Sequence, residues 1–322
     1  MEVSAGTVEY RAYRPGDERA INDGFNEVFG QARSLEEWRW KFPERPEGRW
    51  IMLALDPGGR VLAHYGAVAV QVRFGGAQLR GAQVVDAYSR SEVRGTRVFS
   101  TCYQRFVGSF GAPGGLSFIF GFPGRRHYEM GFKVLNYVPI TSVPYWVRPV
   151  RRRRSLSAWR YGVGEGFEAA AADDLWRRAG ERYDVAAVRD AGWLQRRYLG
   201  RPGVEYVHLA ATRRGRTHAR AVARAQDGVL RWAELVWDGE DERALDALDV
   251  ALDRVARRLS CASLELWLGG DPAAERALER FGWERRPCPL DMLLVTVPFE
   301  ERADMERMRR SFYLTMGDSD LV

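Results

Sequence analysis

The first 147 residues contain short runs of alternating or continuous apolar positions, separated by stretches with helical spacing. Alternation is typical of strands that bury one face, and apolar residues three or four positions apart are typical of amphipathic helices. Gly58-Gly59-Arg60 lies between two of the runs and predicts the turn of a β-hairpin. The predicted strands are Arg49–Leu55, Val61–Val70, Gln83–Tyr88 and Leu116–Phe120, and the predicted helices are Val98–Gly108 and Arg125–Leu135.

The same order of elements recurs in the second half of the chain. The strands predicted there are Val204–Ala211, Thr217–Ala225, Trp232–Trp237 and Ser263–Leu268, and the helices are Arg243–Leu259 and Pro272–Phe281. Trp38–Phe42 has a counterpart in Trp193–Tyr198, and a proline follows each of them. The intervals Gly124–Asn136 and Gly270–Gly282 are both twelve positions long, and each ends on a residue type that terminates helices in the left-handed conformation.

This repetition predicts an α/β (α+β) protein with two copies of one unit, each a mixed, mostly antiparallel twisted sheet flanked by helices. Each copy is expected to end in a further strand, at Val138–Val147 and at Cys288–Val297. We place a first domain at residues 1–150, an Arg-rich linker and connecting segment at 151–182, and a second domain with the C-terminal tail at 183–322. The alternative is a loose similarity of the kind that any two α/β domains show.

Composition describes a globular chain with material for two cores, since 46% of the 322 residues are hydrophobic and 29% are charged. No apolar run approaches the roughly 18 residues of a membrane span, and Met1–Glu18 has no signal-peptide core. Cys102, Cys261 and Cys288 fit neither a disulfide framework nor a zinc site, and the four histidines are scattered. We therefore expect a cytoplasmic protein without a metal site.

The net charge is +6, and the positively charged residues are almost all arginine. The arginines are spread along the chain and no nucleic-acid-binding motif accompanies them, so no nucleic-acid partner is expected. The densest run, Arg151–Arg154, is expected to be a solvated linker. Its alternative is contact with an anionic acceptor or a membrane surface.

A polar turn rich in arginine lies between a predicted strand and a predicted helix. Arg90, Arg94 and Arg97 are in this turn together with Gly95, and the helix follows from Val98. The first amides of a helix have no partner within the helix, and the helix dipole places positive charge there. The turn therefore predicts a phosphate-binding loop.

Val93–Val98, with the sequence Val-Arg-Gly-Thr-Arg-Val, resembles the pyrophosphate loop of the GNAT superfamily of N-acetyltransferases, where Arg-Gly-x-Gly-x-Gly/Ala follows the fourth strand. Arg97 stands where the family usually has glycine, and Phe99 where most members have Gly or Ala. An arginine there would clamp a phosphate with its side chain or block the cleft. The order of elements in both halves also resembles the family, which implies a tandem GNAT bacterial acyltransferase.

The resemblance implies an N-acyltransferase (N-acetyltransferase) that uses acetyl-CoA or another acyl-CoA as co-substrate. The acceptor would be a primary amine of a small molecule, sugar or peptide, attacking the thioester directly. Such a protein has to polarise the thioester oxygen and take a proton from the ammonium group. Two other functions stay open: a non-catalytic GNAT-fold scaffold with an occluded coenzyme site, and a Fem-like transferase that uses aminoacyl-tRNA.

Asp86 is the leading candidate for the general base. It precedes Arg94 by eight residues, where many family members carry an acidic group at the end of the fourth strand. The alternative is a structural carboxylate that caps a turn or pairs with Arg90. The resemblance assigns cofactor binding to the strand amides that face the thioester and to the turn. These residues are Ala87, Tyr88, Arg90, Arg94, Gly95, Thr96, Arg97, Val98 and Phe99.

A proton donor for the departing thiolate is expected on the last helix of the first half. The family often uses a Tyr four residues before the Gly-Phe that closes this helix. If Asn136-Tyr137 is the closure, the position is Phe132, and if Gly131-Phe132 is the closure, it is His127. Tyr128, one turn before Phe132, is the catalytic residue that we select. Packing is the alternative for both Tyr128 and His127.

The second half lacks these features. Its equivalent turn, Asp238–Arg243, is strongly acidic and would repel a diphosphate, so this copy is expected to be degenerate. The closing segment ends in Gly-Asp-Ser-Asp and resembles tails of tandem bacterial GNAT proteins. We expect its Asp318 and Asp320 to be solvated. Trp38–Phe42 lies where the family's first helices line the acceptor site, with packing as the alternative.

Overall fold

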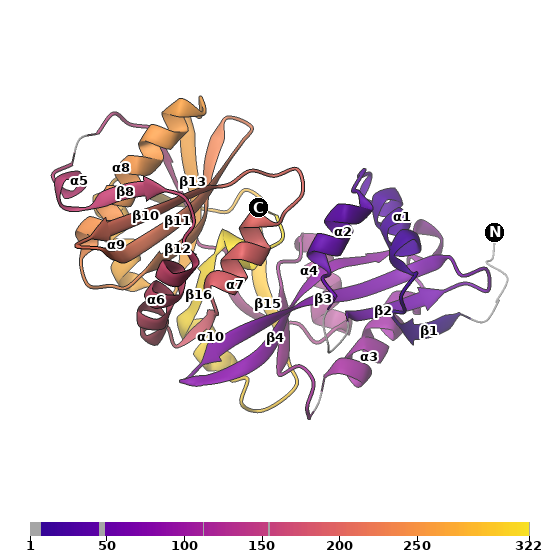
Figure 1. Cartoon of the computed structure of the whole chain (residues 1–322). Coiled ribbons are helices and arrows are strands. Elements are labelled where there is room, and N and C mark those ends of the chain that lie inside the picture. The colour runs from indigo at the N-terminus through magenta and orange to yellow at the C-terminus, as the bar shows by residue number, and fades with distance from the viewer. Residues whose placement is uncertain (1–7, 45–48, 112, 154, 322) are drawn as a thin grey trace. The chain divides into compact units, whose positions relative to one another are not determined.

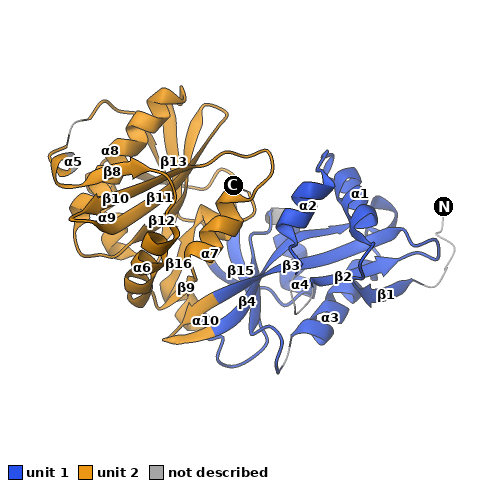
Figure 2. Cartoon of the chain, in the orientation of Figure 1, with its two compact units in different colours: residues 1–71, 79–140, 293–305 blue, residues 72–78, 141–292, 306–322 orange. Residues whose placement is uncertain are grey.

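The computed structural model of the chain describes residues 8–44, 49–111, 113–153 and 155–321. The chain forms two compact units, and each unit is built from three separate segments of sequence (Figure 2). Unit 1 comprises residues 1–71, 79–140 and 293–305, and unit 2 comprises residues 72–78, 141–292 and 306–322. The units therefore differ from the two continuous domains expected at 1–150 and 183–322.

Unit 1 is a mixed sheet with helices on both faces (Figure 1). Its strands are β1 (Glu9–Ala12), β2 (Trp50–Leu55), β3 (Val61–Phe74), β4 (Ala77–Ser89), β5 (Phe118–Gly121), β6 (Val138–Ser142) and β15 (Leu293–Pro298). Its helices are α1 (Glu18–Phe29), α2 (Leu35–Lys41), the short 3-10 helix η1 (Ser91–Val93), α3 (Val98–Phe110) and α4 (Arg125–Val134).

The sheet of unit 1 has the order β1-β2-β3-β4-β5-β15-β6. The pair β4–β5 is parallel, whereas β1–β2, β2–β3 and β5–β15 are antiparallel. Strand β2 shows how both faces are covered, because its side chains alternate between two cores. Trp50, Met52 and Ala54 pack with residues of α3, and Ile51, Leu53 and Leu55 pack with residues of α1 and α2.

Unit 2 repeats this plan with additional elements. Its strands are β7 (Tyr145–Pro149), β8 (Gly162–Glu165), β9 (Val185–Ala187), β10 (Val207–Arg213), β11 (Arg216–Gln226), β12 (Val229–Trp237), β13 (Ser263–Gly269), β14 (Glu284–Arg286) and β16 (Phe312–Thr315). Its helices are α5 (Ser157–Arg160), α6 (Ala169–Ala179), η2 (Gly180–Arg182), α7 (Ala191–Leu194), the π-helix η3 (Gln195–Leu199), α8 (Glu242–Arg258), α9 (Pro272–Arg280) and η4 (Met316–Asp318). Helix α10 (Met305–Ser311) begins at the last residue of unit 1 and continues in unit 2.

Strands β8, β10, β11 and β12 are antiparallel neighbours, and β12 and β13 are parallel. Beyond β13 lie β7 and then β14, both antiparallel. Helix α8 buries an apolar face against this sheet, with Leu245, Leu248, Leu252 and Val255 in the core of unit 2. This spacing is the one that the sequence predicted for a helix at Arg243–Leu259.

The final strands of the two copies are exchanged, which the sequence did not predict. Strand β15 follows the second-half helices in the chain, yet it pairs with β5 in unit 1. Strand β7 follows the first-half helices, yet it pairs with β13 in unit 2. Arg148 of β7 explains part of this choice, because its buried guanidinium lies 2.7 Å from Asp249 and 2.7 Å from Asp253 of α8. A buried charge needs such partners.

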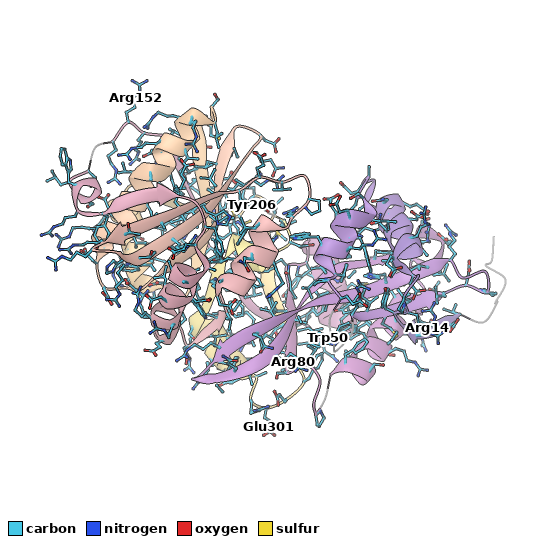
Figure 3. All side chains as sticks on the ribbon, viewed as in Figure 1. Arg14, Trp50, Arg80, Arg152, Tyr206 and Glu301 are labelled. Carbon is cyan, nitrogen blue, oxygen red and sulfur yellow. The ribbon has the colours of Figure 1, made fainter. Side chains whose placement is uncertain are left out.

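The segment expected to be an Arg-rich linker is part of the structure of unit 2. Strand β8 in this segment pairs with β10, and helix α6 follows it. The solvated-linker prediction for Arg151–Arg154 holds for Arg152, which points outward (Figure 3). Arg151 instead donates hydrogen bonds to two backbone carbonyls of unit 2, and Arg153 lies 2.6 Å from Asp246. Arg154 lies outside the described residues.

The prediction of a solvated tail is wrong for Asp318, which is 1% exposed, whereas Asp320 is half-buried. Within the part of the chain that the structure describes, no helix has the length and apolar character needed to cross a membrane.

Candidate functional site

The ladder between β4 and β5 ends well before β4 does. Their described parallel pairs are Gly81 with Phe118, Ala82 with Ile119 and Gln83 with Phe120. Strand β4 continues to Ser89, however, so its last residues lie beyond this ladder. Strand amides without a ladder partner are available to a ligand, because an unpaired backbone donor otherwise costs free energy.

Asp86 lies in this terminal part of β4 and interrupts its regular backbone. Its φ of 53° is in the left-handed region, which Asp tolerates better than most residues do. The backbone carbonyl of Asp86 lies 2.7 Å from Nδ1 of His64 on the neighbouring strand β3. The strand is therefore bent three residues beyond the end of its ladder with β5, and the His64 side chain holds the bend.

The Asp86 carboxylate is clamped by two cations. Its side chain is 1% exposed, and it pairs with Arg33 through Oδ2 and with Lys41, 2.9 Å away, through Oδ1. Burial alone would raise the pKa of Asp86, but the charges of Lys41 and Arg33 outweigh it and hold the pKa below its usual range. A carboxylate with both oxygens bound to cations accepts a proton poorly. The geometry thus favours the structural alternative for Asp86, with Arg33 and Lys41 in place of Arg90.

His64 is fully buried beneath this carboxylate. Burial lowers the pKa of His64 to about 4, so the imidazole is neutral at pH 7. A neutral ring with Nδ1 at hydrogen-bond distance from a carbonyl oxygen carries its proton on Nδ1, which makes His64 the donor to Asp86. The ring also stacks on Tyr88, at 5.3 Å between centroids. His64 is therefore a fixed support of β4.

The Arg-Gly turn after β4 consists of η1 and a short connection to α3. Gly95 has a φ of 80°, which only glycine adopts readily, and a Cβ there would meet no atom within 4 Å. Thr96 accepts a hydrogen bond from the amide of Val98 and donates one to the carbonyl of Val93, at 3.2 and 2.7 Å. The side chains of Arg94 and Arg97 are exposed.

Arg90 was expected to complete this turn, but its side chain is engaged elsewhere. It is 4% exposed, donates to the carbonyl of Val61 at 2.7 Å and pairs with Glu27 of α1. The side chains of Tyr88 and Phe99 are also buried in the cores of unit 1. These two residues can therefore offer a ligand only backbone groups, whereas Arg94 and Arg97 can offer side chains.

Helix α4 ends at the first of the two expected closures, since Asn136 follows it with a left-handed φ of 53°. Phe132 is consequently 61% exposed on this helix, and Tyr128 is half-buried beside it. His127 lies 3.0 Å from the hydroxyl of Tyr137, and burial lowers the pKa of His127. Burial also raises the pKa of Tyr137 to about 12.

Sequence reasoning missed the residues that support β4, namely Arg33, Lys41 and His64. The two cations are 53 and 45 positions from Asp86 in the chain, so no local motif connects them. One signal was present, because Lys41 is one of only two lysines in a chain whose other cations are arginine. A lysine is a compact charge and suits a small buried site.

Among the described residues, one cluster has the donors for a metal ion, and it lies in unit 2. His218, Asp238 and Glu240 have ligand atoms within 4.8 Å of one another. Arginines already neutralise this cluster, because Arg178 pairs with Asp238 and Arg216 lies 3.1 Å from Glu240. We assign no metal to it.

Comparisons with known proteins agree with this geometry. Residues 9–134 match the family model described as an acetyltransferase (GNAT) domain. No curated protein matches the chain. A conserved protein from Enterococcus faecalis V583, described as a probable N-acyltransferase, has a TM-score of 0.69 at 13% identity, covering 91% of this chain and 73% of that one.

Two further solved structures share the fold. A GCN5-related N-acetyltransferase from Anabaena variabilis ATCC 29413 has a TM-score of 0.67 at 11% identity, over 91% of this chain and 73% of that one. N-myristoyltransferase from Saccharomyces cerevisiae with bound myristoyl-CoA has a TM-score of 0.59 at 10% identity, over 92% and 83%. The chain has the GNAT fold, and its residues 9–134 match the acetyltransferase domain of the GNAT family.

Proposed function

We propose that the chain is an acyl-CoA-dependent N-acyltransferase and that unit 1 holds the donor, with acetyl-CoA as the first donor to test. The observation that carries this proposal is the extension of β4 beyond its ladder with β5, beside an Arg-Gly turn and the start of α3. All of these elements lie within the residues that match the acetyltransferase domain model. The acceptor is a primary amine of a small molecule, sugar or peptide.

The turn suits the diphosphate of an acyl-CoA. The first amides of α3 lack partners within the helix, and its dipole adds positive charge at this end. Gly95 lets the backbone approach a phosphate, because the space beside it is open. Arg94 and Arg97 add exposed guanidinium groups, which bind phosphate oxygens through charge-assisted hydrogen bonds.

The end of β4 suits the thioester. The backbone amides of Ala87 and Tyr88 would donate to its oxygen, where negative charge develops when the amine attacks. Asp86 then has a positioning role in this proposal, because its carboxylate and carbonyl fix the bend from which these amides point. The incoming ammonium group would lose its proton to solvent or to a group of the acceptor itself.

Tyr128 remains the proposed hydrogen-bond donor to the departing thiolate, since it lies on the helix that follows β5. His127 is held by the hydroxyl of Tyr137, which fits packing better than proton transfer. A phenol contributes modestly here, because a thiolate is already a stable leaving group.

The two departures from the family loop are compatible with binding. Phe99 turns its side chain into the core, 6.0 Å from the Tyr65 ring, and so leaves the turn free. The side chain of Arg97, the N-cap residue of α3, is exposed. These observations favour an acyl-CoA site that is open at the loop, and they speak against the alternative of a non-catalytic scaffold with an occluded coenzyme site.

Isothermal titration with acetyl-CoA and with desulfo-CoA tests the proposal. Arg94→Ala and Arg97→Ala should each weaken binding about five- to tenfold, the equivalent of about 1–1.4 kcal/mol. Raising the salt concentration should reduce the difference from wild type, because exposed charges are screened. Arg152→Ala is the matched control, since it removes an equally exposed arginine from unit 2.

Absence of binding at millimolar donor would overturn the proposal, as would equal losses in the control variant. Acyl transfer that occurs only with aminoacyl-tRNA would instead support the Fem-like alternative.

A further inference from the structure

Unit 2 contains a pair of parting strands. Like β4 and β5, the parallel strands β12 and β13 follow an antiparallel hairpin and are each succeeded by a helix. Their described pairs run from Val229 with Ser263 to Trp232 with Leu266. Both strands continue beyond these pairs, β12 to Trp237 and β13 to Gly269. Unit 2 therefore has an interstrand groove between β12 and β13 beyond Leu266.

The C-terminal segment Phe312–Ser319 lies in this groove and is bonded to both of its walls. On one side, β16 pairs with β13, with Leu314 opposite Gly269 and Thr315 opposite Leu268. On the other side, the Tyr313 hydroxyl donates to the carbonyl of Leu235 on β12 at 2.7 Å. The segment thus takes ladder positions of β13 beyond Leu266, pairs also with β9 through Phe312 and Tyr313, and contacts β12 through side chains.

A buried ion-pair cluster fixes the segment. Arg189 donates to Glu234 of β12 at 2.9 Å and to Asp318 of the segment at 2.6 Å. Thr315 donates to Glu234 at 2.9 Å, and its amide donates to Asp318 at 2.8 Å. The side chains of Arg189, Glu234 and Asp318 are at most 1% exposed. Buried charges of this kind require their partners, so the segment and β12 are held together.

The fit is also close. A Cβ on Gly317 would overlap the hydroxyl of Tyr198 and the carboxylate of Glu234. A Cβ on Gly270, directly after β13, would overlap the backbone of Phe312. The groove is therefore filled at both ends of the segment with little space to spare.

We infer that Phe312–Ser319 is a built-in occupant of the unit 2 groove, taking the place there that the pantetheine arm takes in unit 1. The comparison with unit 1 rests on the proposed function, whereas the occupation of the groove does not. The acidic start of α8 also indicates that unit 2 binds no donor. The side chain of Asp241 accepts a hydrogen bond from the amide of Arg243 and so occupies the helix N-terminus, where a diphosphate would otherwise bind. The chain consequently binds one acyl-CoA.

Hydrogen–deuterium exchange of the full chain and titration with acetyl-CoA together test this inference. The amides of Leu314 and Thr315 should be protected in the wild type, and titration should give one donor per chain. Asp318→Asn and Gly317→Val should each raise exchange in Phe312–Ser319 and at Gly269 at least tenfold, and leave the amides of β4 unchanged. Asp320→Asn is the matched control, because it makes the same change at a half-buried position two residues further on.

Two donors per chain would overturn the inference, and so would a wild-type segment that exchanges as fast as an unstructured peptide. If Gly317→Val fails to fold, the isosteric Asp318→Asn still provides the exchange readout. A wild type with a protected segment and no donor binding would contradict the proposed function alone, since protection of the segment requires no coenzyme.

Discussion

The Asp86→Asn variant separates the two roles considered for this residue. The substitution keeps the shape of the side chain and removes the charge that faces Arg33 and Lys41. Breaking a buried ion pair from one side costs about 3–5 kcal/mol, because the remaining charge is left without a partner. Arg33 is 8% exposed and Lys41 is 14% exposed, so both retain some contact with water, and the amide oxygen still accepts a hydrogen bond. We therefore expect a loss of about 2–3 kcal/mol in the free energy of unfolding of unit 1.

The assay should report on unit 1 alone, because the chain has two units and its unfolding need not be a single transition. Hydrogen exchange of the β4 amides under native conditions meets this need.

The depressed pKa of Asp86 also sets the pH dependence of stability. The contribution of Asp86 to the free energy of unfolding is present above the pKa of an aspartate in the unfolded chain, about 4, and is lost as the pH falls through the folded-state pKa. The difference between wild type and variant should therefore shrink in acid. Asp23→Asn is the matched control, since Asp23 is an exposed carboxylate of α1, and it should change stability by less than about 0.5 kcal/mol.

Enzyme kinetics of Asp86→Asn would refute the structural role of Asp86 if they showed the behaviour of a general base. If Asp86 were the general base, Asp86→Asn would lower kcat/KM by a factor of about 100 or more at unchanged stability, and the acidic limb of the pH profile would lose its dependence on that group. An unfolding free energy within 0.5 kcal/mol of wild type would show that the clamp does not hold β4.

Two further predictions concern stability. Gly131→Ala should cost about 1–3 kcal/mol, because the new methyl group would overlap the Tyr137 ring. Gly108→Ala should instead gain about 0.5–1 kcal/mol, because Gly108 is an exposed position of α3. Thermal unfolding of both variants checks this, and losses of equal size would contradict it. Burial, against the opposing charge of Arg189, raises the pKa of Asp318 to about 6. Between pH 4 and 6 the Asp318 carboxyl is therefore protonated in the folded state and ionised in the unfolded state. The free energy of unfolding falls by about 2–3 kcal/mol as the pH rises through this range, because the folded state loses this proton. Asp318→Asn should flatten this slope in urea titrations at pH 4–7, and identical slopes would refute the assignment.

The sequence pattern was sufficient for the elements of each copy. The hairpin predicted from Gly58-Gly59-Arg60 is β2–β3, and the helix predicted at Arg243–Leu259 is α8. Local turn chemistry and apolar periodicity determine such elements. The fold class followed from their repeated order.

The exchange of β7 and β15 was beyond the reach of the same reasoning. Both segments are apolar runs that fit beside any parallel strand, so their periodicity carries no information about the partner. The sheet in which each strand lies depends on contacts such as those of Arg148 with Asp249 and Asp253, which are about 100 positions away in the chain. Sequence spacing does not reveal that distant charges meet.

Part of the candidate site could be predicted from local sequence, and part of it depends on residues that are distant in the chain. The Arg-Gly turn was found because its chemistry is local, and the exposed Arg94 and Arg97 lie where it was expected. Arg90 lies in the same turn, but its partner Glu27 is on α1, so spacing alone placed its side chain incorrectly. The buried tail was missed because aspartates near a terminus are usually hydrated, whereas Arg189 and the Thr315 amide bind the carboxylate of Asp318 in the core.

The exchanged strands have a consequence for biosynthesis. Strand β5 emerges from the ribosome long before Pro298 of β15 exists, so the open edge of β5 must wait for its neighbour. At about 5–20 residues per second this wait lasts on the order of ten to thirty seconds. An uncovered strand edge recruits foreign strands, so a nascent chain arrested after residue 150 should aggregate or engage chaperones. The protein has to mature as one piece, after nearly its whole length has been translated.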